Sequence, residues 1–172
     1  MIKFQLNEIS ESISAFNKSI ALNPNIFEAY FNRGISKYQL KDYIGSIHDF
    51  DKAIELKADT AQAYVNRGVA KSEIADYKGA ISDFTIAIKL QPKSDMNYFV
   101  RGIAKMNLKD YDGAILDLDK SINLNPKNAK AFLSRGVLKI AINQNQSGCK
   151  DLFKAKELGD LNASKIINNS CN

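Results

Sequence analysis

Asn32-Arg33-Gly34 is the first of four tripeptides that recur at a fixed interval in this sequence. The later copies read Asn66-Arg67-Gly68, Val100-Arg101-Gly102 and Ser134-Arg135-Gly136. Their glycines stand 34 residues apart each time. A fixed period of this size is typical of stacked supersecondary units rather than of one closed globule. The sequence therefore predicts a repeat array that covers most of its 172 residues.

Other positions keep the same period. An aromatic residue precedes each glycine by four positions, and a small residue and a second bulky apolar residue follow it. These three sets are Tyr30, Tyr64, Tyr98 and Phe132; Ser46, Ala80, Ala114 and Gly148; and Phe50, Phe84, Leu118 and Leu152. Their order, with Pro24, Pro92 and Pro126 at the boundaries, resembles the tetratricopeptide repeat. The resemblance implies an all-α, right-handed α-solenoid of helix-turn-helix repeats with a C-terminal capping helix.

The period divides the chain into segments of one tetratricopeptide domain. They are a half repeat at 1–26 that holds a second helix only, repeats at 27–60, 61–94, 95–128 and 129–159, and the capping helix at 160–172. The half repeat carries Ile9, Ile13, Phe16 and Ile20 at helical spacing. Such a face is seldom left in water. We therefore expect either that the natural protein continues N-terminally or that something else covers this face.

Polar residues predict where the helices begin. We expect Asn25, Asp59 and Ser94 to cap the first helices of three repeats, and Asp42, Asp76 and Asp110 to cap the second helices. Their side-chain oxygens suit the free N–H groups of a first turn. Gly159 is expected to stop the last repeat in a left-handed conformation. After it, Leu161, Ala163, Ile166 and Ile167 form the apolar side of the capping helix.

Composition argues against several classes of function. His48 is the single histidine, and no glycine-rich phosphate loop is present, so the sequence predicts no enzyme, no cofactor and no metal site. No apolar run approaches 18 residues, so membrane insertion is not expected. Nine of the Lys and Arg residues and three of the acidic residues lie from Lys120 onward. This basic end indicates either an acidic partner or a solvated surface, and without an Arg-rich, aromatic cluster it does not predict nucleic-acid binding.

Cys149 and Cys171 are the two cysteines of the chain. Gly159 lies between them, so two antiparallel helices that meet there would bring both to the same end. A disulfide is then possible, and the alternative is a buried thiol at 149 with a frayed one at 171. The location follows this choice: cytoplasmic for free thiols, or periplasmic or secreted if the two are bonded.

A charged pattern also repeats. Arg33, Arg67, Arg101 and Arg135 precede Asp49, Asp83, Asp117 and Asp151 by sixteen residues each. Because the two helices of such a repeat run antiparallel, we expect ion pairs within a repeat or across to its neighbour, which specify register more than they add stability. The alternative is a basic stripe that is open to an acidic ligand.

The resemblance also implies a binding surface, since the first helices of tetratricopeptide arrays line a concave groove. The positions it assigns to this groove are Phe31, Ile35, Tyr38, Val65, Val69, Phe99, Ile103, Met106, Leu133, Val137 and Ile140. They form an apolar stripe separate from the one that holds the repeated aromatic and glycine residues. Asn32 and Asn66 flank it, and in similar arrays of O-linked sugar transferases asparagines at this position hold a peptide backbone. The Lys and Asn clamp with which co-chaperone relatives bind a C-terminal carboxylate is replaced here by apolar residues.

The sequence thus predicts a non-catalytic protein–protein interaction module. Its partner would be a peptide or helix of another protein, bound in the concave apolar groove. The alternative is a self-association or scaffolding module of a longer protein, which would act through the N-terminal face of the half repeat.

Overall fold

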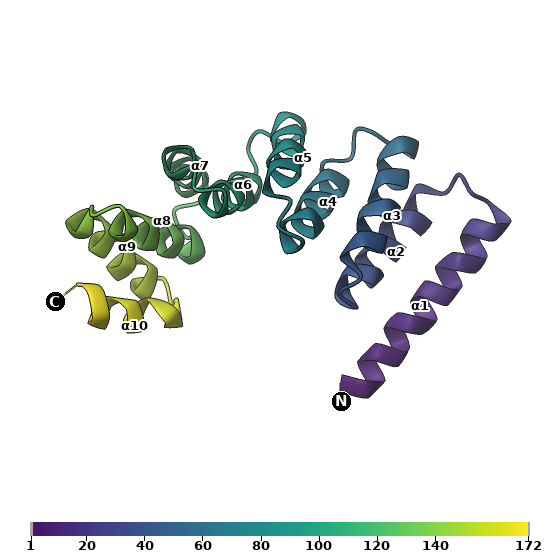
Figure 1. Ribbon diagram of the computed structural model, residues 1–172, viewed down its shortest axis with the longest axis horizontal. Helices are drawn as coiled ribbons and strands as arrows, with labels where there is room; N and C mark the ends of the chain where they lie inside the picture. The colour runs from purple at the N-terminus through teal and green to yellow at the C-terminus, as the bar shows by residue number, and fades with distance from the viewer. Residues whose placement is uncertain (1, 172) are drawn as a thin grey trace. The chain divides into compact units, whose positions relative to one another are not determined.

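A computed structural model describes the backbone of residues 2–171 and the side chains of residues 8–171. Ten α-helices follow one another along this range, which contains no strand (Figure 1). They are α1 (Ile2–Leu22), α2 (Phe27–Gln39), α3 (Tyr43–Leu56), α4 (Ala61–Glu73), α5 (Tyr77–Leu90), α6 (Asp95–Asn107), α7 (Tyr111–Leu124), α8 (Ala129–Ala141), α9 (Asn145–Glu157) and α10 (Leu161–Ser170). The prediction of an all-α chain of helix pairs is confirmed. None of the helices in this range is both long and apolar enough to cross a lipid bilayer.

The helices form two compact units. Unit 1 is Met1–Gln91 and unit 2 is Pro92–Asn172. In unit 1, α2 pairs with α3 and α4 pairs with α5, while α3 packs against α4 and α1 packs against α2. In unit 2, α6 pairs with α7 and α8 pairs with α9, α7 packs against α8, and α10 covers α9 and touches α8. Each first helix therefore packs against the second helix of its own repeat, as the sequence pattern predicts.

The repeated glycines allow these pairs to approach closely. A Cβ atom on Gly68 would lie 2.7 Å from the Phe84 ring, and one on Gly34 would lie 2.9 Å from the Phe50 ring. Both rings are 1% exposed and form the centre of their helix pairs. The usual cost of glycine in a helix, about 1 kcal/mol, is thus offset by the packing of a large ring against bare backbone.

Unit 2 has the same kind of core with smaller residues. One cluster consists of Ala114, Leu118, Ile122, Ala131 and Leu138. A second cluster, at the C-terminal end, consists of Leu152, Ala155, Ala163 and Ile167. The capping helix α10 therefore buries Ala163 and Ile167 as expected. Leu161 does not join them and is 91% exposed, because it is the first residue of α10 and lies ahead of the turn that contacts α9.

The second helices begin as predicted, but two of the first helices do not. Asp42, Asp76 and Asp110 accept hydrogen bonds from the backbone N–H of Gly45, Gly79 and Gly113. Ser94 accepts one from Asn97. The predicted caps at Asn25 and Asp59 are wrong, because α2 begins after Ile26 and α4 after Thr60, each without a side-chain cap. Both predicted residues lie one position too early to reach a free N–H group.

Residues with the left-handed backbone conformation, at positive φ, lie in several of the turns between consecutive helices. Gly159 has φ 92°, as its place at the end of α9 predicts. Lys41, Ala75, Lys109 and Asn143 also have positive φ values, between 61° and 66°. At Lys41 the turn is held by two backbone hydrogen bonds, from Lys41 N to Tyr38 O and from Asp42 N to Lys37 O, both 2.9 Å. This is the arrangement in which glycine is usual, so the Lys and Ala side chains at three of these sites carry a conformational cost, whereas asparagine tolerates the conformation.

A disulfide joins Cys149 of α9 to Cys171, directly after α10, with 5.7 Å between their Cα atoms. The sequence left open a disulfide or two free thiols, and the structure has the disulfide. The bond fastens the end of the capping helix to the helix that it covers.

Candidate functional site

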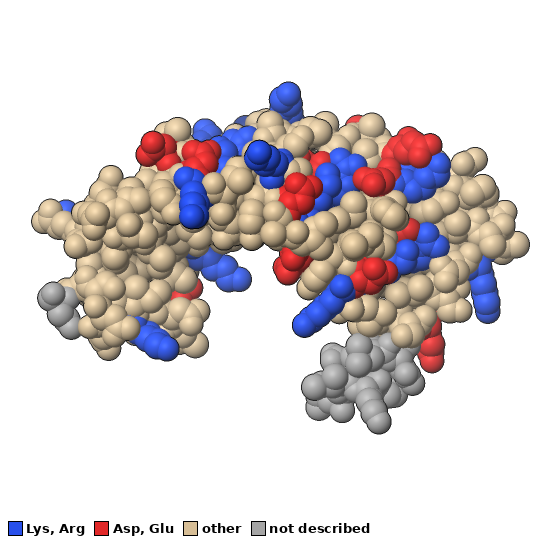
Figure 2. Space-filling model, in the orientation of Figure 1, with Lys and Arg blue, Asp and Glu red and all other residues tan. Residues whose placement is uncertain are grey.

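Buried ion pairs occupy one side of the helix pairs. Arg67 of α4 contacts Asp83 of α5 through Nε and Nη2, at 3.0 and 2.6 Å, and Lys71 reaches the same carboxylate at 2.8 Å. Asp83 is 2% exposed. The other three repeats have the same arrangement around Asp49, Asp117 and Asp151. Figure 2 shows basic and acidic side chains side by side on one face of the molecule.

These pairs also raise the pKa values of the arginines. Burial lowers the pKa of Arg67, but its hydrogen bonds and attraction to Asp83 and Asp51 outweigh this, so that the net pKa is raised. Arg135 behaves in the same way, with Asp151 and Asp119 as its partners. The repeated arginines are therefore held in structural pairs, and the alternative of a basic stripe open to an acidic ligand is excluded.

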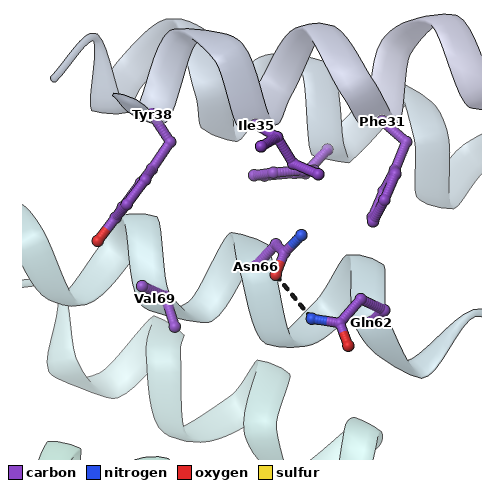
Figure 3. A pocket seen from close by; sticks show the side chains of 7 residues that line it. Phe31, Ile35, Tyr38, Gln62, Asn66 and Val69 are labelled. Carbon is purple, nitrogen blue, oxygen red and sulfur yellow. Dashed lines mark hydrogen bonds between the residues drawn. The ribbon is translucent and has the colours of Figure 1, made fainter. Parts of the chain in front are cut away.

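An apolar cavity of about 390 Å³ lies within unit 1, between α2 and α4 (Figure 3). Its lining consists of Phe31, Ile35 and Tyr38 from α2, Phe50 from α3, and Gln62, Asn66 and Val69 from α4. In Figure 3, Phe31 and Gln62 stand at one end of the cavity, and Tyr38 and Val69 stand at the other. A volume of this size is within the usual range for sites that hold a small ligand or a few side chains.

Aromatic contacts fix the apolar side of this cavity. Phe31 meets Phe50 edge to face, with 5.8 Å between ring centroids, and stacks on Phe27 at 5.4 Å. Phe50 itself is buried in the core of the α2–α3 pair. The wall formed by Phe31 is therefore rigid, because its ring is held by the rings on either side.

Two amides form the polar edge of the cavity on α4. Gln62 Nε2 donates a hydrogen bond to Asn66 Oδ1 at 2.8 Å. The two residues are one helical turn apart, which places them side by side on the helix surface. Their bond leaves the Gln62 oxygen as an acceptor and the Asn66 nitrogen as a donor, and Figure 3 shows this nitrogen directed toward α2.

A second polar link lies at the Tyr38 end of the cavity. The Tyr38 hydroxyl donates a hydrogen bond to Glu73 Oε1 at 3.1 Å, so that it joins the ends of α2 and α4. Burial of the phenol raises the pKa of Tyr38 to about 12, and its hydrogen bond to the Glu73 carboxylate adds to the shift. Tyr38 therefore remains a neutral hydrogen-bond donor at physiological pH.

A sequence profile described as tetratricopeptide repeat matches residues 27–60, 61–94 and 97–128, which together make up more than half of the chain. The chain belongs to the tetratricopeptide repeat family. Proteins of this family are typically non-catalytic interaction modules, so membership makes the chain a protein–protein interaction module. A comparison with curated protein sequences gives no match.

Solved structures of other tetratricopeptide repeat (TPR) proteins share the fold. A crystal structure of MamA is 23% identical over 94% of this chain and 95% of that chain, with a TM-score of 0.86. YrrB, described as a TPR protein with an unusual peptide-binding site, is 18% identical over 98% and 87%, with a TM-score of 0.82. The first TPR of Spaghetti (RPAP3), bound to the HSP90 peptide SRMEEVD, is 20% identical over 68% and 93%, with a TM-score of 0.66. At these identities the likeness shows the fold alone.

The residues of unit 1 that the sequence assigned to the groove lie in three places: around the cavity, in the core and on the exposed surface. Phe31, Ile35, Tyr38, Asn66 and Val69 come together around the cavity. Val65, in contrast, is 9% exposed and belongs to the core. Asn32 is exposed on α2 and does not line the cavity.

Two lining residues were missed by the sequence reasoning. Gln62 precedes Asn66 by four positions on the same helix, which is a signal that could have found it. Phe50 was assigned to packing, and it serves the core and the cavity wall together.

The equivalent positions of unit 2 are used largely for packing. Phe99 and Met106 contact the cluster around Leu118, and Leu133 and Ile140 contact the C-terminal cluster around Leu152. Ile103 is half-buried, and Val137 is 37% exposed. The exposed part of the predicted stripe is therefore small in this unit, which leaves the cavity of unit 1 as the candidate site.

The single histidine of the chain does not line the cavity. His48 is exposed on α3, as expected for a solvated histidine. Within residues 8–171, no three His, Cys, Asp or Glu side chains come close enough to hold a metal ion. The lining of the cavity consists of aromatic, aliphatic and amide side chains, a composition that suits ligand binding.

Proposed function

We propose that the chain is a non-catalytic module that binds an extended segment of a partner protein in the cavity between α2 and α4. An apolar side chain of the segment enters between Phe31, Ile35 and Val69. The free acceptor of Gln62 and the free donor of Asn66 pair with a backbone N–H and C=O of the segment. The observation that carries this proposal is the combination of an open apolar cavity with an amide pair along one edge.

The energetics fit a weak, reversible interaction. Burial of one Leu or Phe side chain contributes about 1.5–3 kcal/mol. A hydrogen bond with each of the two amides adds about 1 kcal/mol. Since association also costs translational freedom, a short segment that fills this cavity alone would bind weakly. Tighter binding requires further contacts along the segment.

The chemistry of the cavity also selects against one kind of segment. Its lining contains no Lys or Arg. An acidic C-terminal tail, such as the HSP90 peptide bound by the first TPR of Spaghetti, needs cations to pair with its carboxylates. We therefore infer that acidic tails are not the ligands of this site.

A peptide-display library panned on the full chain provides the test. Val69→Asp, which places a carboxylate in the cavity, is expected to weaken the selected peptides more than tenfold, because the charge would have to be desolvated on binding. Ile44→Asp is the matched control, since Ile44 is 61% exposed and does not line the cavity. Equal binding by both variants, with unchanged helicity, would contradict the proposal.

Self-association through α1 is the second candidate. Among the described residues, α1 packs against α2 alone, and Ile9, Ile13, Phe16 and Ile20 remain only half-buried. A second copy could cover this face. Light scattering across a concentration series distinguishes the two, because a dimer that is lost on Phe16→Lys would favour self-association.

A further inference from the structure

The charges around the cavity differ between its two ends. At the Tyr38 end stands Glu73, the last residue of α4. No Lys or Arg within residues 8–171 pairs with Glu73, and its hydrogen-bond donor there is the neutral Tyr38 hydroxyl. Since a carboxylate can accept about four hydrogen bonds, most of its capacity is left over.

The Phe31 end carries both signs of charge. Glu28 lies in the first turn of α2, one turn before Phe31. Lys57 lies over the ring of Phe27, with Nζ 5.7 Å from the centroid, and Phe27 stacks on Phe31. The two ends of the cavity therefore differ in charge, since Glu28 and Lys57 belong to the Phe31 end and Glu73 is bonded to Tyr38 at the other.

Glu73 is also held in place. Its hydrogen bond to Tyr38 spans α2 and α4, and the Tyr38 ring in turn contacts the Tyr43 ring of α3 at 5.4 Å between centroids. An oriented carboxylate beside an apolar cavity is the arrangement that recognises a cationic side chain next to an apolar one. Its attraction to a cation is stronger than that of a freely moving surface carboxylate, because less side-chain entropy is lost on binding.

We propose that the segment bound between α2 and α4 carries a Lys or Arg next to its apolar anchor, on the side that faces Glu73. This inference rests on the proposed function, since it names the class of partner for the same cavity. The apolar anchor provides most of the affinity, and the cation fixes the direction in which the segment lies along α2 and α4. An extended segment places neighbouring side chains about 3.3 Å apart along its axis, so the flexible stem of Lys or Arg spans the remaining distance to the Glu73 end.

Panning of the same peptide library on charge variants tests the inference. Wild type is expected to select peptides in which an apolar residue is followed or preceded by Lys or Arg. Glu73→Lys is expected to select peptides with Asp or Glu in place of this Lys or Arg. Glu157→Lys is the matched control, because it changes the net charge equally on an exposed residue of unit 2. It should select the same peptides as wild type.

Affinities of one selected peptide complete the test. Replacement of its cation by Gln should weaken binding to wild type about two- to fivefold at low salt, as expected for a partly exposed pair, and should not affect binding to Glu73→Gln. Apolar peptides selected without any charge preference, and bound equally by Glu73→Lys, would overturn the inference while the proposed cavity stands. Peptides that bind Val69→Asp as well as wild type would overturn both.

Discussion

Arg67 connects two successive repeats through Asp51, since its Nη1 lies 2.7 Å from Asp51 Oδ1 while Nε and Nη2 hold Asp83. Arg135 makes the same connection to Asp119 at 2.6 Å. Arg33 uses Nη1 for Asn17 of α1 at 2.7 Å. One guanidinium thus joins the two helices of its own repeat to the second helix of the preceding one. Because guanidinium groups are planar and rigid, this contact specifies how neighbouring repeats stack.

Loss of Asp83 should destabilise unit 1 far more than loss of Asp51. Asp83→Ala removes a buried carboxylate and leaves Arg67 and Lys71 without it, at an expected cost of about 3–5 kcal/mol. Asp51 is 50% exposed, so Asp51→Ala should cost about 1 kcal/mol or less. Urea-unfolding midpoints of the two variants measure the difference. Similar midpoints would contradict the structural role of the buried pair.

Methyl groups added at two repeat glycines should have unequal effects. On Gly68 a Cβ lies 2.7 Å from the Phe84 ring, and the ring cannot move because it is fully packed. On Gly102 it lies 3.2 Å from Leu118 Cγ, which can shift by a few tenths of an ångström. Overpacking of about 1–3 kcal/mol should exceed the helix-propensity gain of about 1 kcal/mol in Gly68→Ala but not in Gly102→Ala. Thermal unfolding of both variants checks this, and equal shifts would contradict it.

Replacement of a strained residue by glycine should stabilise the chain. Ala75 has φ 61°, where a Cβ is unfavourable, so Ala75→Gly is expected to raise the free energy of unfolding by up to about 1 kcal/mol. Asn143 has φ 64°, but asparagine tolerates this conformation. Asn143→Gly is therefore the control, with little expected gain. Denaturant unfolding of both variants measures the effect, and a destabilised Ala75→Gly would show that the left-handed turn carries no strain.

Tyr38 should ionise at unusually high pH. Its pKa of about 12 is raised by burial and by the Glu73 hydrogen bond, against an ordinary value of about 10. The neutral phenol therefore stabilises the fold below about pH 10, and this contribution is lost as the pH rises through about 12. Ultraviolet titration of wild type and Tyr38→Phe should differ by one tyrosine that ionises near 12. A difference centred near pH 10 would contradict the buried, hydrogen-bonded position.

The disulfide should stabilise the C-terminal end of unit 2. It closes a loop with a sequence separation of 22 residues, for which the chain-entropy account gives about 3 kcal/mol. Reduction, or Cys149→Ser, is expected to speed amide hydrogen exchange in α10 more than in α6 or α7. Detection of two free thiols in the oxidised protein would contradict the bond.

The sequence predicted the helix pairs well because the residues that recur every 34 positions are the ones that pack the two helices of each pair together. The repeated glycines and rings, such as Gly68 and Phe84, are needed wherever two helices approach, so their spacing fixes the architecture. The left-handed residues at Lys41, Ala75 and Lys109 could not be predicted in this way. Nothing in a Lys or Ala signals a positive φ, which these turns impose through their backbone hydrogen bonds.

The candidate site was predicted only in part. Val65 has the spacing of a groove residue but is buried in the core. Phe99, at an equivalent position, packs against the core of unit 2. Apolar residues at helical spacing occur both in cores and in binding surfaces. Which of the two a residue belongs to depends on the helices that pack around it, and the sequence pattern does not contain this information. The Tyr38–Glu73 contact joins residues 35 positions apart and has no local sequence signal.

The affinities of a library-selected peptide for Val69→Asp and for Ile44→Asp locate the binding site. If the segment lies between α2 and α4, isothermal titration will show at least a tenfold loss of affinity for Val69→Asp and none for Ile44→Asp, with wild-type helicity in both. Wild-type affinity in a folded Val69→Asp would place the binding site outside the cavity between α2 and α4.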